Sequence, residues 1–316
     1  MQRKAKDPLG FLKFIMFGLV LIVRSKKMKA SVIVPTYNKL SRLRLFLESM
    51  KGQNCSKTEF EVVLVNDGSS DQTKEFLDQY EYEVPCKVVH INNSGRAFAR
   101  NRGIVESEGD ILIFCDDDMI LPPDYVSSHI KEQESIHGSV VHGCIYSLSY
   151  LKYFQDPTIG VQYDNGICTN KYLLMHCIDL EDIRVRFDTK FRKERKKDIM
   201  ETFVVQTFQN KSSDYYWVSL NGGNVSVPRD WIIEAGMFEE RFGKQWGGED
   251  IELGYRLYKQ GRSFVYSEAA YNYHMCHLRK NVDIDMKNSF IKFYEMHKDE
   301  RIMQVYERMR TGKVFI

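Results

Sequence analysis

The stretch that decides the fold is Ile111-Leu112-Ile113-Phe114-Cys115-Asp116-Asp117-Asp118, in which an apolar run of strand length ends in three carboxylates. A buried strand that delivers charged groups to the edge of a sheet is typical of ligand sites in open α/β domains. Three adjacent carboxylates repel one another and stay ionised most readily beside a cation or in contact with solvent. The sequence therefore predicts a cation site at this point.

Asp116 and Asp118 are two residues apart, so in an extended chain they share a face and Asp117 points away from it. Carboxylate oxygens suit Mg²⁺ or Mn²⁺, and these ions also bind phosphate oxygens. His274 and His277 lie near the end of a later strand and are candidates for a third ligand. The alternative is a turn or helix start decorated with acids.

The residues before this stretch alternate between strand and helix patterns. Short apolar runs predict buried strands at 31–35, 61–65 and 87–91. Helices are predicted after each strand: one at 40–50, one that follows the turn at 67–71 and ends at about residue 80, and one at 94–107. This order predicts an α/β fold with a mostly parallel central sheet flanked by helices. Ligands in such sheets bind beyond the carboxyl ends of the strands, so the loops at 36–38, 67–71 and 116–118 should converge on one crevice.

Neither a GxGxxG nor a GxxxxGK[ST] motif follows these strands, so phosphates would have to be held by a metal ion and arginines. Arg96 and Arg100 are four residues apart and share a helix face, where guanidinium groups suit a diphosphate. Surface salt bridges are the alternative use of these arginines. Asp67 can accept hydrogen bonds from a nucleoside, or it can stabilise a turn.

A second group of signals lies in the later part of the chain. Residues 179–201 are dense in charge and predict one or two exposed helices, which form a solvated face or a basic lip against a membrane or an acidic acceptor. Paired glycines precede a short strand at 224–227. A helix is predicted at 231–238, a further strand at 263–266 and a C-terminal helix at 290–309.

The segment Trp246-Gly247-Gly248-Glu249-Asp250 places two carboxylates at the start of a helix. A carboxylate there can accept the proton of a hydroxyl group, and an indole offers a platform for the apolar face of a sugar. The alternative is that the acids cap the helix and the tryptophan belongs to the core.

The bulk composition narrows the class of protein. The 316 residues include 45 basic and 43 acidic side chains, and a net charge of +2 gives no general reason to bind nucleic acid. The seven cysteines form no CxxC pair and indicate reduced thiols of the cytoplasm.

Residues 1–27 are the compositional exception. An apolar run at 9–23 is flanked by basic residues and is shorter than the roughly 20 residues that a membrane span needs. It predicts an anchor at an anionic membrane surface, with a true start at Met28 as the alternative.

Several ordered motifs together resemble the family 2 glycosyltransferases of the GT-A fold. The segments Ser31-Val32-Ile33-Val34-Pro35-Thr36-Tyr37-Asn38, Val65-Asn66-Asp67-Gly68-Ser69 and Ala99-Arg100-Asn101-Arg102-Gly103-Ile104 look like nucleotide-binding segments of that family. Asp116-Asp117-Asp118 looks like its DxD motif. Gly223-Asn224-Val225-Ser226 and the WGGED segment are similar to the acceptor half of chondroitin-polymerase-like and galactosyltransferase-like enzymes.

The resemblance implies an inverting, metal-dependent transfer of a sugar from a nucleotide diphosphate donor, most often a UDP-sugar, to a hydroxyl acceptor. Mn²⁺ or Mg²⁺ would be held by Asp118, Asp116 and His274, with His277 as the alternative ligand. Asp250 would be the general base, and Trp246, Gly248 and Glu249 would bind the acceptor. The donor would be bound by these residues: Pro35, Thr36, Tyr37, Asn38, Asp67, Arg96, Arg100, Asp116 and Asp117.

From these expectations we divide the chain into an N-terminal segment (1–27), a nucleotide-sugar-binding half (28–145), an acceptor-binding half (146–285) and a C-terminal helix (286–316). The expected acceptor is a saccharide, a lipid-linked saccharide or a polypeptide in the synthesis of a surface glycan, with the enzyme in the cytoplasm at the inner face of the membrane. The alternatives are a nucleotidyl- or phosphotransferase that uses the same carboxylates, and a non-catalytic sugar-binding module.

Overall fold

The computed structural model describes residues 28–136, 138–148, 178–277 and 282–311, and three short strands between 154 and 167. Residues 1–27, with the predicted membrane anchor, lie outside the described residues. Among the helices that are described, none is long and apolar enough to cross a membrane. The five cysteines that the structure describes are all free thiols.

The first part of the chain alternates strands and helices as predicted. Apolar β-branched runs form the strands, and all eight residues of β2 are buried. The elements in order are β1 (Ala30–Thr36), α2 (Leu40–Lys51), β2 (Phe60–Asp67), α3 (Thr73–Gln79), β3 (Cys86–Ile91), α4 (Arg96–Glu106), β4 (Ile111–Cys115), β5 (Met119–Ile120), α5 (Tyr125–Ser135) and β6 (Val140–Leu148).

The second part of the chain begins with a small antiparallel sheet and adds two more strands to the main sheet. Its elements are β7 (Phe154–Asp156), β8 (Gly160–Tyr163), β9 (Gly166–Ile167), α7 (Leu180–Arg184), α8 (Phe187–Phe191), α9 (Ile199–Gln209), the 3-10 helix η1 (Ser213–Ser219), β10 (Asn224–Pro228), α10 (Arg229–Glu234), the 3-10 helix η2 (Glu240–Phe242), α11 (Glu249–Lys259), β11 (Phe264–Met275), α12 (Val282–His297) and α13 (Glu300–Thr311).

The main sheet has eight strands in the order β3-β2-β1-β4-β10-β6-β11-β5. The pairings β3–β2, β2–β1, β1–β4 and β6–β11 are parallel, whereas β4–β10, β10–β6 and β11–β5 are antiparallel. The α/β fold is confirmed, and its sheet is mixed because β10 runs against β4. Strands from both predicted halves therefore belong to one sheet.

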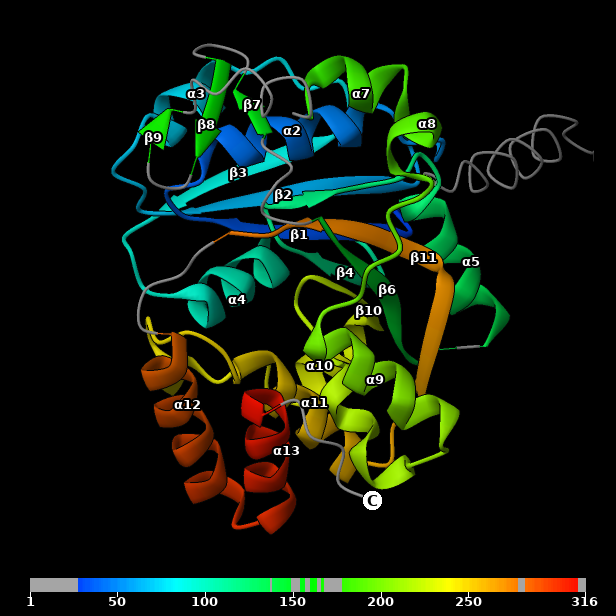
Figure 1. Ribbon diagram of the computed structural model, residues 1–316, viewed down its shortest axis with the longest axis vertical. Coiled ribbons are helices and arrows are strands. Elements are labelled where there is room, and N and C mark those ends of the chain that lie inside the picture. Colours follow the sequence, from blue (N-terminus) through cyan, green and yellow to red (C-terminus); the bar gives the residue numbers. More distant parts are fainter. Residues whose placement is uncertain are drawn as a thin grey trace, which may run out of the picture.

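Helices cover both faces of this sheet. On one face, α2 and α5 pack through Leu43, Phe46 and Tyr125 against β1 and β4. On the other face, α4 packs through Ala97 and Ile104 in a core that continues into α11, α12 and α13. Figure 1 shows α2 and α3 above the sheet and α4 and the C-terminal helices below it. The carboxyl ends of β1, β2 and β4 thus face the later part of the chain.

Two local predictions differ from the structure. The helices of the charge-dense block are present, but Ile183, Phe187 and Phe191 are buried against β6 and β11, so the block is only partly a solvated face. The single C-terminal helix is two helices, because the chain turns at Lys298, which has a φ of 52°, before α13 begins.

Gly143, in the centre of β6, is a position where a side chain would disrupt the packing of the sheet. A Cβ atom there would overlap the carbonyl oxygen of Ala270 and the side chain of Asn224, where β11 has an irregularity between Ser267 and Asn272. We expect Gly143→Ala to lower the free energy of unfolding by about 1–3 kcal/mol, as overpacking of a dense core does.

Urea denaturation measures this loss, with Gly52→Ala as the control. The nearest atom to a Cβ at Gly52 lies at 3.7 Å, so this variant should unfold like the parent chain. Equal stability of the two variants would contradict the close packing of β6 against β11.

Candidate active site

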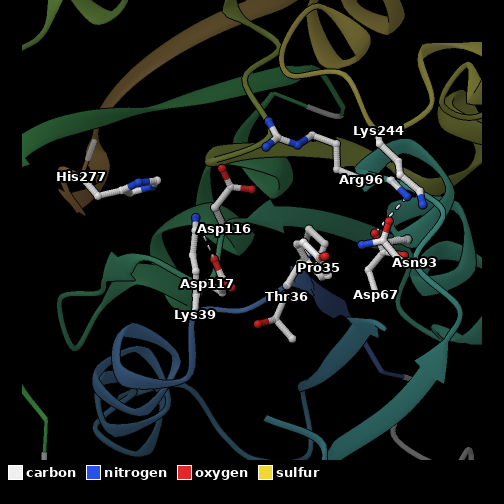
Figure 2. A pocket seen from close by; sticks show the side chains of 13 residues that line it. Pro35, Thr36, Lys39, Asp67, Asn93, Arg96, Asp116, Asp117, Lys244 and His277 are labelled. Atoms are coloured by element: carbon white, nitrogen blue, oxygen red, sulfur yellow. Dashed lines mark hydrogen bonds and ion pairs between the residues drawn. The ribbon is translucent and has the colours of Figure 1, made fainter. Parts of the chain in front are cut away.

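Two hollows open beyond the carboxyl ends of β1, β2 and β4. The larger has a volume of about 750 Å³ and the smaller about 170 Å³, and Arg96 and Asp116 line both of them. Figure 2 shows the larger hollow with polar side chains directed toward its centre. Seven of the nine predicted donor-binding residues line it: Pro35, Thr36, Tyr37, Asp67, Arg96, Asp116 and Asp117.

Asp67 ends β2 and fixes the loop that precedes α4. Its carboxylate accepts hydrogen bonds from the backbone N–H groups of Ser94, at 2.7 Å, and Gly95, at 2.9 Å. Burial raises the pKa of Asp67 above its usual range, although these hydrogen bonds and the charge of Lys244 act against that shift. The carboxylate therefore holds the wall of the hollow in place as well as lining it.

Asn38 is a predicted donor-binding residue that does not line either hollow. Its side-chain oxygen accepts hydrogen bonds from the backbone N–H groups of Ser70, at 2.7 Å, and Asp71, at 3.3 Å. Its φ of 52° is the left-handed conformation that asparagine tolerates better than most residues. Asn38 thus joins the loop after β1 to the loop after β2.

The three aspartates form the turn between β4 and β5 and do not continue the strand. The extended chain that the predicted shared face of Asp116 and Asp118 assumed is therefore absent. Among the described residues, the ligand atoms close enough to share a metal ion group Asp118 with the two histidines and not with Asp116, so a metal role for Asp116 stays a prediction. Asp116 is bound to Arg100, while Asp117 lines the larger hollow. Asp118 is fully buried and is bound by Lys39 Nζ at 2.6 Å.

Asp118 lies with His274 and His277 in a cluster that can hold a metal ion. The distances from Asp118 Oδ2 to the Nε2 atoms are 3.7 Å for His274 and 3.0 Å for His277, and the three ligand atoms all lie within 4.8 Å of one another. One carboxylate oxygen and two imidazole nitrogens form a mixed ligand set that suits a divalent ion. The structure thus brings both candidate histidines to the turn.

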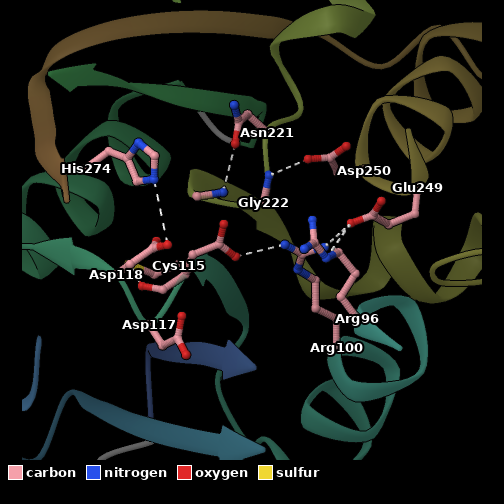
Figure 3. Close-up of polar contacts among 12 residues, drawn as sticks. Arg96, Arg100, Cys115, Asp117, Asp118, Asn221, Gly222, Glu249, Asp250 and His274 are labelled. Atoms are coloured by element: carbon pink, nitrogen blue, oxygen red, sulfur yellow. Dashed lines mark hydrogen bonds and ion pairs between the residues drawn. The ribbon is translucent and has the colours of Figure 1, made fainter. Parts of the chain in front are cut away.

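The pairing of β5 with β11 builds this cluster. His274 in β11 is opposite Met119 in β5, so the histidine lies beside the aspartate turn. Figure 3 shows the His274 ring directed toward Asp118. Although burial acts in the opposite direction, the Asp118 carboxylate raises the pKa of His274 to about 10.

Arg100 joins the aspartate turn to the WGGED segment. Its side chain is 2% exposed, with Nη2 at 2.9 Å from Asp116 Oδ1 and Nη1 at 2.8 Å from Glu249 Oε1. Figure 3 shows the guanidinium groups of Arg100 and Arg96 beside the Glu249 carboxylate. A Cβ atom at Gly222 would overlap the guanidinium, so a glycine is needed there. Arg100, predicted to bind the donor, and Glu249, predicted to bind the acceptor, are thus ion-paired with each other.

Asp250 is next to this ion pair and faces the smaller hollow. Its carboxylate accepts hydrogen bonds from the backbone N–H groups of Gly222, at 3.0 Å, and Ile251, at 2.8 Å. Burial, reinforced by the Glu249 charge, raises the pKa of Asp250 to about 6. A carboxyl group with such a pKa is ionised near neutral pH and is more basic than an ordinary aspartate.

The smaller hollow combines this carboxylate with a largely apolar wall. Trp246, Gly248 and Asp250 line it, whereas Glu249 does not. That Trp246, Gly248 and Glu249 bind the acceptor stays a prediction. The remaining wall is rich in methionine, and it comes partly from the C-terminal helices through Met286, Phe290 and Met309. The shape of this hollow therefore depends on α12 and α13 as well as on the WGGED segment.

The structure adds three polar residues that sequence reasoning missed. Lys39, Asn93 and Lys244 line the larger hollow, and the two lysines give it positive charge. Lys39 directly follows the motif that ends at Asn38, and Lys244 lies two residues before Trp246, where the WGGED segment begins. Their closeness to these motifs was the available sequence signal. Asn93 offered none.

Comparison with known proteins agrees with this geometry. The model of the glycosyl transferase family 2 matches residues 31–209. The uncharacterized glycosyltransferase YfnE of Bacillus subtilis is 30% identical over 295 residues, which are 88% of this chain and 73% of that protein. Several other curated relatives are longer, and the chain spans 24–56% of their length.

Solved structures show the same fold. TarS of Staphylococcus aureus in complex with UDP-GlcNAc has a TM-score of 0.56 and 19% identity, over 90% of this chain and 72% of that chain. The mannosyltransferase PcManGT of Pyrobaculum calidifontis, in complex with GDP-Man and Mn²⁺, has a TM-score of 0.54 and 13% identity, over 92% and 72%. The solved structures thus show the fold, and the matched family model and the relative at 30% identity show the family. This chain belongs to glycosyltransferase family 2, has the GT-A fold and is a glycosyltransferase.

Proposed function

We propose that the chain is an inverting, metal-dependent transferase that moves a sugar from a UDP-sugar to a hydroxyl group of a glycan or glycoconjugate acceptor. The observation that carries this proposal is the position of Asp250. It faces a hollow that shares Arg96 and Asp116 with the larger hollow, so a base and a donor site adjoin each other.

The donor is assigned to the larger hollow. Its volume of about 750 Å³ is in the range of pockets that enclose small organic ligands. Arg96, Lys39 and Lys244 supply positive charge for a diphosphate, and Asp67 and Asn93 supply polar groups for a nucleoside. UDP is the favoured nucleotide because TarS was solved with UDP-GlcNAc and with UDP, although PcManGT was solved with GDP-Man.

The chemistry follows from the two adjoining hollows. With the acceptor hydroxyl in the smaller hollow, the Asp250 carboxylate takes its proton as the oxygen forms a bond to the anomeric carbon. The bond from that carbon to the diphosphate oxygen breaks, and UDP leaves with the electron pair. Attack from the face opposite the leaving group inverts the anomeric configuration. Arg100 and the backbone N–H groups of Gly222 and Ile251 hold Asp250 and its neighbour in place.

We assign the divalent ion to Asp118, His274 and His277. When bound, this ion would neutralise the charge of the diphosphate leaving group. Two imidazole nitrogens favour Mn²⁺ over Mg²⁺, because Mg²⁺ prefers oxygen ligands. The presence of Mn²⁺ in the PcManGT complex supports the same choice.

We also propose that the enzyme works in the cytoplasm at the inner face of the membrane and builds a surface glycan or a lipid-linked saccharide. The support is the apolar run at residues 9–23 between basic residues, a pattern that binds anionic membrane surfaces.

The test of the function is a UDP-release screen over nucleotide sugars with Mn²⁺, comparing the parent chain with Asp250→Asn. We expect the substitution to lower transfer by about 10²–10⁴-fold, because that is the usual contribution of a general base. Affinity for UDP should change little. For the parent chain, kcat/KM should rise with pH through about 6, since the base must be ionised.

The exposed Asp230 on α10 provides the control, and Asp230→Asn should behave like the parent chain. Retained turnover by Asp250→Asn would exclude Asp250 as the base. Release of pyrophosphate or phosphate in place of UDP would indicate a nucleotidyl- or phosphotransferase. No release with any donor and acceptor would indicate a non-catalytic sugar-binding module.

The metal assignment is tested separately by calorimetric titration of Mn²⁺ into His274→Ala and His277→Ala. Each substitution removes one of the three proposed ligands. Loss of a residue that only supports a ligand already lowers metal affinity by about tenfold or more, so we expect Mn²⁺ affinity to fall by at least that factor. His90→Ala is the control, because His90 is bound to Asp78 and Asn66 away from the cluster. Unchanged Mn²⁺ affinity in both variants would contradict the assignment.

A further inference from the structure

The segment that links α8 to α9 (residues 192–197) has the sequence Arg-Lys-Glu-Arg-Lys-Lys and concentrates positive charge. It holds five cationic side chains and one carboxylate, in a chain whose net charge is +2. Runs of like charge of this kind commonly mark a surface that binds a polyanion. We call residues 192–197 the α8–α9 linker.

Most of these cations face solvent. Arg192, Lys193, Arg195 and Lys196 are exposed, and no ion pair is seen for Arg192, Lys193 or Lys196 in the part of the chain that the structure describes. Their mutual repulsion is therefore relieved by solvent and mobile anions. A ligand with several negative charges would relieve it further.

The α8–α9 linker is held firmly against the main sheet. The backbone N–H of Ser147 in β6 donates to Lys196 O at 2.7 Å. The Arg195 guanidinium lies over the rings of Tyr146, at 4.7 Å, and Tyr271, at 5.1 Å. Figure 1 shows this segment running from α8 across β11 to α9. The cations are thus presented by an ordered surface.

Two further hollows are lined by cations of the linker. A hollow of about 310 Å³ is lined by Arg192, Arg195, Tyr271 and Tyr273, with Asp188 as its acidic residue. A second hollow, of about 180 Å³, is lined by Lys197 and Arg308.

This second hollow adjoins the smaller hollow of the active site, because Asp198 lines both. Asp198 accepts a hydrogen bond from the backbone N–H of Glu201 and begins α9. The nearest counter-charge to Lys197 is Glu268, at 4.0 Å. Lys197 and Arg308 therefore line the hollow that adjoins the smaller hollow of the active site, together with Asp198.

We propose that the α8–α9 linker binds anionic groups of the acceptor, so that the acceptor is a negatively charged glycan with phosphodiester or carboxylate groups along its chain. Its reactive end occupies the smaller hollow and its charged units lie along the linker. This inference rests on the proposed acceptor role of the hollow beside Asp250.

The size of the acceptor hollow agrees with an acceptor that extends beyond it. A volume of about 170 Å³ is close to that of an engineered cavity of about 150 Å³ that holds a benzene ring, so there is room for about one sugar ring. Further units of a polymer must lie outside this hollow. The linker and the hollow lined by Lys197 and Arg308 offer positive charge beside it.

The test measures binding of labelled oligomers of equal length by fluorescence anisotropy, in the absence of a donor sugar. The probes are a galacturonate oligomer, a glycerol-phosphate oligomer and a neutral galactose oligomer. The variant is Arg192→Gln/Lys193→Gln/Lys196→Gln, which changes exposed residues without an ion pair in the described part of the chain. The matched control is Lys57→Gln/Lys131→Gln/Lys259→Gln, which removes the same charge from exposed positions elsewhere.

We expect an anionic oligomer to bind more tightly than the neutral one, and high salt to remove the difference. The linker variant should weaken anionic binding by about tenfold, because each exposed ion pair contributes a few-fold, while the control variant binds like the parent chain. The two anionic probes distinguish a carboxylate glycan from a phosphodiester polymer.

Equal binding of the anionic and neutral oligomers, or no effect of the linker variant, would overturn the proposal. So would a variant that loses only its binding to phosphatidylglycerol vesicles, since the linker would then be a membrane surface. Because no donor is present, an absence of UDP release would contradict the proposed function and leave this binding measurement intact.

Discussion

The buried ion pairs of Arg100 are the interaction on which the active site depends. A guanidinium that is 2% exposed bridges Asp116 at the end of β4 and Glu249 at the start of α11, two residues far apart in the sequence. Burial of a charge costs several kcal/mol unless it is paired and hydrogen-bonded, so these three side chains require one another. The bridge fixes the aspartate turn against the helix that carries Asp250.

This constraint explains several neighbouring features. Gly222 lacks a side chain where the guanidinium passes, and its backbone N–H is bound to Asp250. Asp116 is held by Arg100 at one side of the turn, and Asp118 is left to His274 and His277 at the other. In the proposed function the turn therefore has two tasks, because Asp116 would organise the proposed base and Asp118 the proposed metal cluster.

The sequence predicted the parts of the site that follow strands. Apolar runs that end in polar residues located Thr36, Asp67 and Asp116 correctly beside one hollow, because parallel strands end at the same edge of a sheet. The geometry of the aspartates could not be predicted, since a turn and an extended chain have the same sequence signal there. The ion-pair partners of Arg100 could not be predicted either. Helical spacing shows which side chains share one face of a helix, but it does not show which part of the chain packs against that face.

The later part of the chain was harder to predict for a related reason. β10 enters the sheet between β4 and β6 and runs antiparallel to both, a position that only tertiary pairing decides. The methionine-rich wall of the smaller hollow comes partly from α12 and α13, which lie outside the residues 31–209 matched by the family model. We therefore expect residues outside the range matched by the family model to influence which acceptor is bound.

The most direct measurement of the central claim compares Arg100→Lys with Arg102→Lys in steady-state transfer and in UDP binding. Arg102 lies on the same helix and is paired with Glu106 at the surface, so its substitution should leave kcat unchanged. A lysine at position 100 keeps the charge but cannot bridge two carboxylates with a planar fork. We predict a loss of kcat of about tenfold or more, equivalent to about 1.4 kcal/mol, with UDP affinity and folding retained. A kcat equal to that of Arg102→Lys would contradict the claim that Arg100 holds the base in its working position.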